Sequence, residues 1–107
     1  CEVSDKIKLL CSFIDQSKKD VEELNSAIEN CNRKKLRETV HRMLPMWKLL
    51  HNEEMLFAYR SLLKDERASD TALKEYTQRI INHTDMLMAA AKNEIKRQTN
   101  ETENTDS

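Results

Sequence analysis

The sequence predicts an all-α protein, an antiparallel four-helix bundle with a kinked second helix that carries a histidine on its polar side. The chain of 107 residues contains no glycine and a single proline, so it lacks the residues that tight sheet turns and phosphate-binding loops need. Its composition is 38% hydrophobic and 35% charged, and its apolar residues recur three and four positions apart. This length suits one domain, which buries roughly 65% of the surface of the unfolded chain.

The first predicted helix covers about residues 4–30, where the following apolar side chains keep helical spacing: Ile7, Leu10, Ile14, Val21, Leu24, Ile28 and Cys31. Ser4, followed by Asp5, is the expected N-cap. The segment Asn-Cys-Asn-Arg at 30–33 is the most turn-like part before the next periodic stretch. Without a glycine, the reversal there needs an asparagine in a tight conformation. Because this turn is short, we expect the first two helices to be antiparallel.

Three further helices follow along the chain. The second covers about residues 33–50, and Asn52 is the expected N-cap of a third at 53–64, whose first turn is acidic. Residues 65–69 end that helix. The fourth helix shows an apolar stripe, in which Thr84 fills a gap: Leu73, Tyr76, Ile80, Leu87, Ala91 and Ile95.

The end of the chain differs in composition from the rest. Residues 98–107 carry no apolar side chain, so burial cannot offset the entropy of ordering them. We therefore expect a four-helix domain at 1–98 and a disordered polar tail at 99–107.

The cysteines and the net charge restrict the environment and the partners. Three cysteines are an odd number, and Cys11 and Cys31 are in phase with apolar neighbours, which predicts small buried thiols in a reducing cytoplasm.

The formal charge of -1 argues against binding to nucleic acid. No apolar run approaches the ~20 residues that span a bilayer, so we expect no direct membrane contact. Because the chain starts at Cys1 and not at Met, we expect it to be part of a longer polypeptide.

His41 is the candidate reactive residue. Five apolar side chains of the second helix fall within a sector of roughly 80°: Leu36, Val40, Met43, Trp47 and Leu50. His41 points about 140° away from the centre of this sector, toward solvent. Pro45 cannot donate a backbone hydrogen bond to the carbonyl of His41, and its ring crowds that carbonyl, which predicts a kink with its convex side exposed. Both observations predict an accessible imidazole.

Positive charge surrounds this histidine. Arg37 and Lys48 lie within about 40° of its direction, and residues 33–50 contain six basic residues against Glu38 alone. A phosphoryl group on His41 would have cations nearby, and an acidic active site on another protein would be attracted. The alternative is an ordinary solvated helix face.

The sequence offers little for other chemistry. His41, His51 and His83 are too far apart in sequence to form a helical metal-binding pair, and the cysteines have no paired spacing. There is no Ser-His-acid arrangement, Walker loop or kinase nucleotide-binding signature. We therefore expect no metal site and no ATP binding.

The residues around His41 resemble the histidine-containing phosphotransfer (HPt) domain of bacterial phosphorelays, usually the last module of a hybrid two-component sensor histidine kinase. The resemblance covers most of the chain: Leu-Asn-Ser-Ala-Ile at 24–28, a polar turn, Leu-Arg-Glu-Thr-Val-His-Arg-Met at 36–43, and a helix after Leu-His-Asn at 50–52. In that family an apolar residue, a lysine and a glycine follow two, three and four positions after the histidine. Met43 fits, whereas Leu44 and Pro45 replace lysine and glycine, which is similar to hybrid sensors of Bacteroides-like bacteria.

The resemblance implies that the imidazole of His41 accepts a phosphoryl group from a receiver-domain aspartate and passes it to another receiver. Arg37 or Lys48 then supplies the missing cation. The docking surface for receivers would consist of Arg42, Leu44, Pro45 and Leu49, with Leu9 and Phe13 of the first helix as an extension.

The resemblance also places the Mg²⁺ of the reaction in the partner receiver, so we expect no cofactor and no autonomous kinase activity in this chain. A monomeric cytoplasmic domain is expected, in a parent protein that can be an inner-membrane sensor kinase.

Two other interpretations remain open. A helical adapter with an incidental surface histidine would explain the same pattern, since histidine is common on helix surfaces. A secreted four-helix signalling protein would require paired cysteines and a signal peptide, and this sequence has neither.

Overall fold

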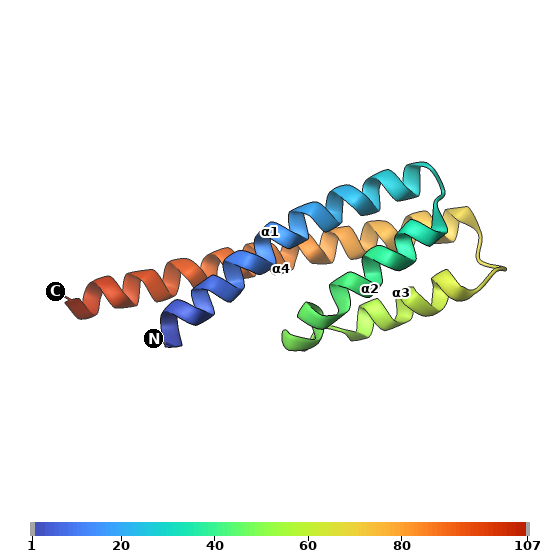
Figure 1. Cartoon of the computed structure of the whole chain (residues 1–107). Coiled ribbons are helices and arrows are strands. Elements are labelled where there is room, and N and C mark those ends of the chain that lie inside the picture. The colour runs from blue at the N-terminus through green and yellow to red at the C-terminus, as the bar shows by residue number, and fades with distance from the viewer. Residues whose placement is uncertain (1, 107) are drawn as a thin grey trace.

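The computed structural model describes the backbone of residues 2–106 and the side chains of residues 5–100. Its four helices are α1 (Glu2–Glu29), α2 (Arg33–Leu49), α3 (Glu54–Lys64) and α4 (Asp70–Asp106), and the described residues contain no strand (Figure 1). The predicted all-helical fold with four helices is thus confirmed. None of the described helices is both long and apolar enough to cross a membrane.

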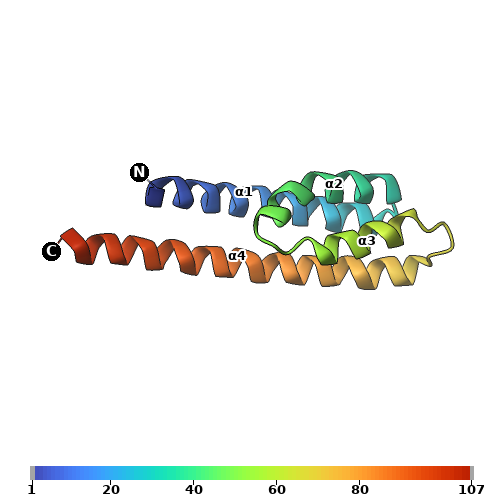
Figure 2. The ribbon, with the colours of Figure 1, turned by 90° about the horizontal axis from the view of Figure 1, so that it is seen from below.

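The helices form a bundle of unequal length. α1 packs against α2 and α4. α3 also packs against α2 and α4. Because α2 and α3 are short, they cover only one part of the α1–α4 pair. Beyond their connecting loop, α1 and α4 continue as a two-helix extension, and the described part of the chain measures 60 × 20 × 16 Å (Figures 1 and 2).

The core lies where all four helices meet. α2 contributes its apolar stripe, and Val40, Met43 and Trp47 are buried as predicted. α3 contributes Leu56, Tyr59 and Leu63, and the other two helices add the remaining buried apolar side chains: Leu10, Phe13, Ile14, Leu24, Ala27, Leu73, Ile80, Ile81 and Ala91. This one-sided burial keeps the opposite side of α2 free of core packing.

Two helix ends are closed by residues in the left-handed region. After α1, Cys31 has φ 51°, its N–H donates to Ile28 O (3.1 Å), and the N–H of Asn32 donates to Ala27 O (2.8 Å). This pair of bonds is the Schellman arrangement, which usually contains glycine at the left-handed position. The prediction that an asparagine takes this conformation is therefore wrong. Asn32 instead caps α2, because its side chain accepts from the N–H of Lys35.

The end of α2 repeats this arrangement. His51 has φ 58° and donates to Lys48 O (3.0 Å), while the N–H of Asn52 donates to Trp47 O (2.9 Å). The side chain of Asn52 donates to Leu50 O and lies 3.2 Å from Nε2 of His83. Asn52 therefore does not cap α3, contrary to the prediction, because its side chain folds back onto the loop.

The first helix also begins earlier than expected. α1 includes Glu2, so Ser4 lies inside it and does not cap it. Cys11 and Cys31 are exposed free thiols, so the prediction that they are core residues is wrong. Cys11 follows the buried Leu10 and so points away from the core, and Cys31 lies in the turn.

Two further details concern helix continuity. α4 continues through Asp106, whereas the sequence predicts a disordered tail at 99–107. No proline or glycine interrupts these residues, and a helix that has already formed extends with little further cost. Pro45 lies inside α2, which remains one helix to Leu49, and the predicted kink stays a prediction.

Candidate functional site

The candidate site is centred on His41, in the middle of α2. Its side chain is exposed, whereas Val40 before it and Met43 after it are buried in the core. The amphipathic pattern of α2 thus places the imidazole on the solvent side, as the sequence predicts. An accessible imidazole is a nucleophile at neutral pH and needs no cavity in its own chain to react.

Arg42, the next residue, is anchored to α1. Its Nη2 donates to Asp20 Oδ1 at 2.7 Å, its Nε donates to the same oxygen at 3.3 Å, and Nη2 also donates to Glu23 Oε2. The carboxylate of Asp20 is buried and also accepts from Gln16. The hydrogen bonds that Arg42 donates to Asp20 and Glu23 raise its pKa. The charge of Arg42, predicted to contribute to docking, is therefore largely compensated within the chain.

The carboxylate of Glu23 also holds a second residue close to the histidine. The hydroxyl of Thr39, two positions before His41, donates to Glu23 Oε2 (3.2 Å) and is within 2.9 Å of Lys35 O. The hydrogen bond from Arg42 lowers the pKa of Glu23, with a smaller effect from Thr39. α1 thus binds the residues on both sides of His41 and fixes the rotation of α2.

The two predicted phosphate-supporting cations both face α3. Arg37 is exposed and lines a groove of about 290 Å³ together with Arg33, Leu63, Lys64 and Glu66. Lys48 is exposed as well, and its Nζ lies 5.5 Å from the centre of the Phe57 ring. They therefore mark two ends of the α2–α3 surface, and His41 lies between them in the sequence of α2.

The predicted docking surface is only partly exposed. Pro45 is exposed, and Leu49 is 60% exposed. Leu44 is only 5% exposed, so its assignment to the surface is wrong. α3 packs beside α2 and widens the buried face of α2 beyond the stripe that its sequence shows.

The proposed extension onto α1 is also divided. Leu9 is 38% exposed, whereas Phe13 is 2% exposed, which excludes Phe13 from the surface. Phe13 lines a small internal hollow with Met43 and Trp47, under the part of α2 that follows His41. The first helix therefore offers Leu9 alone from this pair.

One residue of the site was missed from the sequence. Phe57 on α3 is 41% exposed and packs under Lys48, close to the exposed Leu49 end of α2. Its signal was its position directly after Leu56, which belongs to the buried stripe, so that Phe57 points away from the core. An aromatic side chain at such a place is typical of interaction surfaces.

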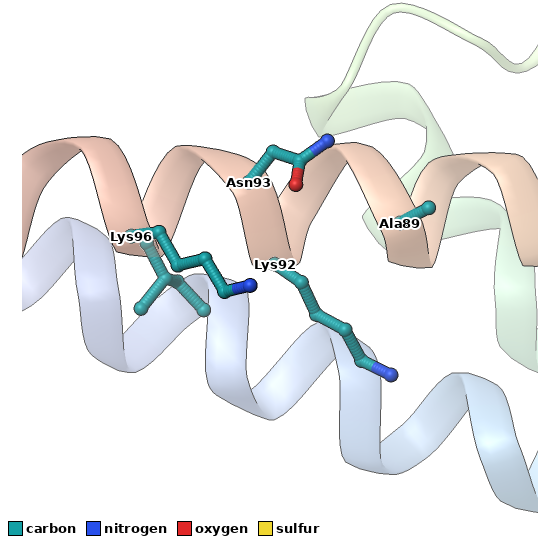
Figure 3. A pocket seen from close by; sticks show the side chains of 5 residues that line it. Ala89, Lys92, Asn93 and Lys96 are labelled. Carbon is teal, nitrogen blue, oxygen red and sulfur yellow. The ribbon is translucent and has the colours of Figure 1, made fainter.

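No other part of the described chain competes with this site. Among residues 5–100, whose side chains the structure describes, no group of three side chains is able to hold a metal ion. A shallow hollow of about 390 Å³ lies on α4 where it runs alongside α1, lined by Ala89, Lys92, Asn93, Ile95 and Lys96 (Figure 3). Its lining contains no histidine, cysteine, serine or carboxylate side chain.

Comparison with models of protein families, with curated proteins and with solved structures finds no match for this chain.

Proposed function

We propose that the chain is a histidine phosphotransfer domain, which carries a phosphoryl group on His41 between receiver-domain aspartates. The observation that carries this proposal is an exposed imidazole in the middle of a helix whose neighbouring residues are fixed by α1. The resemblance of residues 24–52 to HPt domains supplies the reaction class. A carrier needs an accessible nucleophile on a rigid scaffold, and α2 offers both.

The transfer requires only the imidazole from this chain. An unprotonated ring nitrogen of His41 attacks the phosphorus of the aspartyl phosphate. The N–P bond forms as the P–O bond to the aspartate breaks, and the aspartate leaves as a carboxylate with the bonding electrons. The proton on the other ring nitrogen remains there or passes to water. The Mg²⁺ and the acidic pocket belong to the receiver, and no hydrolytic base is needed next to His41.

The surface around His41 supports docking of an acidic partner. α2 carries six basic residues and one acidic residue, and only Arg42 and Arg33 among these bases form ion pairs within the described residues. Pro45 and Leu49 of α2 and Phe57 of α3 add exposed apolar contact area. Charge then steers the encounter, and the apolar side chains determine how long the complex lasts.

Phosphotransfer from a phosphorylated receiver tests the proposal. The wild type should gain acid-labile, alkali-stable phosphate, and His41→Gln should abolish this gain without changing the melting temperature. His51→Gln is the matched control, because His51 is also exposed but lies in the loop after α2. Added salt should lower the affinity for the receiver.

Failure of transfer from several receivers would contradict the proposal. A partner that binds wild type and His41→Gln equally well, without any transfer, would instead support an adapter with an incidental histidine.

A further inference from the structure

Position 44 cannot provide a cation for a phosphorylated His41. The HPt domains that the chain resembles have lysine there, three residues after the histidine, whereas Leu44 is apolar and buried in the core. Arg42 is occupied by Asp20 and Glu23. A phosphoryl group that bears about two negative charges would therefore need its partner from another element.

The contacts between α2 and α3 define the level of His41 along the bundle. At one end of the interface Lys48 lies over Phe57, and toward the other end Arg37 lines the same groove as Lys64. The two helices are antiparallel, so the stretch from Phe57 to Lys64 follows the stretch from Lys48 back to Arg37 (Figure 1). His41 lies between the two ends on α2, and Arg60 lies between them on α3.

Arg60 is on the edge of α3 that faces α2. It follows Phe57 by three positions and precedes Lys64 by four, which are the spacings of neighbours on one helix face. Arg60 is half-buried, and within the described residues it forms no ion pair or hydrogen bond through its side chain. Lys64 is exposed and likewise unpaired there. With a rise of about 1.5 Å per residue, these two cations are about 6 Å apart along α3.

We propose that α3 supplies the missing cation: Arg60, with Lys64 one turn further, binds the phosphoryl oxygens on His41. This inference rests on the proposed function. A guanidinium suits the task because it can donate two parallel hydrogen bonds to a phosphoryl group. His41 is seven residues from Lys48 and four from Arg37, so the turn of α3 from Arg60 to Lys64 follows its level along the bundle. Glu66 lies in the loop beyond Lys64.

Chemical phosphorylation tests this assignment without any receiver. Phosphoramidate transfers its phosphoryl group to an imidazole: an N–P bond to His41 forms, the P–N bond of phosphoramidate breaks, and ammonia leaves. The rate of uptake is followed by intact mass at neutral pH. Arg60→Gln should slow uptake on His41 by about five- to tenfold, and Lys64→Gln should slow it less, because charge-assisted hydrogen bonds to the transferred group are lost.

Controls separate charge from folding. Arg60→Lys keeps a cation and should retain most of the rate, and Arg67→Gln removes an equal charge beyond the end of α3 and should leave the rate unchanged. In wild type, the Arg60 side-chain Nε–H signal in NMR spectra should shift when His41 is phosphorylated, while that of Arg67 should not. A purely structural role of Arg60 would not produce this shift.

The outcomes distinguish the two proposals. Phosphorylation of His41 with equal rates in wild type and Arg60→Gln, and an unshifted Arg60 signal, would overturn the role of Arg60 and leave the carrier function standing. Uptake that does not depend on His41 would overturn the proposed function itself.

Discussion

Arg42, next to His41, donates to the buried carboxylate of Asp20 on α1, with 2.7 Å between Nη2 and Oδ1. This ion pair joins α2 to α1 directly beside the candidate nucleophile. It also takes one arginine out of the basic surface of α2, so that the cations left near His41 are those facing α3. Near the histidine, Arg42 thus has a structural role, whereas Arg37 and Lys48 form no ion pair within the described residues.

Loss of this ion pair should destabilise the bundle. Asp20→Ala is expected to lower the free energy of unfolding by about 2 kcal/mol, because Arg42 loses charge-assisted hydrogen bonds but remains partly hydrated. Urea denaturation followed by circular dichroism measures this change, and Asp15→Ala, an exposed carboxylate of the same helix, is the control. Equal stability of the two variants would show that the pair contributes nothing.

Glycine at the left-handed positions should stabilise the chain. Cys31→Gly and His51→Gly are each expected to raise the free energy of unfolding by about 1 kcal/mol, because a side chain with Cβ is strained at positive φ. Ser26→Gly, within α1, should lower it by about 0.5–1 kcal/mol. Thermal unfolding of the three variants checks the contrast, and destabilisation by both turn substitutions would contradict the left-handed assignment.

Truncation of Leu44 should lower the stability of the fold, whereas truncation of Leu49 should weaken receiver binding. Leu44→Ala is expected to cost about 2–4 kcal/mol of stability, because it opens a cavity in the core. Leu49→Ala should change stability by less than about 0.5 kcal/mol and weaken receiver binding instead. Paired denaturation and binding measurements test this, and a stable Leu44→Ala variant with weaker binding would restore Leu44 to the docking surface.

Tyr59 should make the fold sensitive to alkali. Burial raises the pKa of Tyr59 to about 12, an effect partly offset by its hydrogen bond with Thr77. The folded-state pKa is above the ordinary value of 10. The contribution of the protonated Tyr59 to the free energy of unfolding is therefore fully present below pH 10 and is lost as the pH rises toward 12. Tyrosinate absorbance should show that one tyrosine titrates late. Between pH 10 and 12, Tyr59→Phe should lose about 2 kcal/mol less of its free energy of unfolding than wild type. Identical pH profiles would contradict this.

The sequence was sufficient for the helices and for the exposure of His41, because both depend on local periodicity. The stripe of Val40, Met43 and Trp47 determines the rotation of α2, and this rotation places the imidazole outside. The errors at Leu44 and Phe13 arose where a neighbouring helix covers a side chain that lies off the main stripe. Such burial depends on how the helices pack, which the periodicity of one helix does not contain.

The polar contacts were beyond prediction for a similar reason. Asp20 and Arg42 are 22 positions apart, and nothing in the spacing of either helix pairs them. The left-handed residue in the first turn was assigned to asparagine from its usual preference, whereas hydrogen-bond closure placed Cys31 there. The register between α2 and α3 was equally inaccessible, so the sequence did not indicate which residues of α3 lie beside α2.

The most direct measurement is the location of phosphate after incubation with a phosphorylated receiver, determined by intact mass on wild type and on single Gln variants of the three histidines. The account predicts one phosphoryl group per chain in wild type, His51→Gln and His83→Gln, lost in acid and absent from His41→Gln. Phosphate that persists in His41→Gln, or none in any variant, would contradict it.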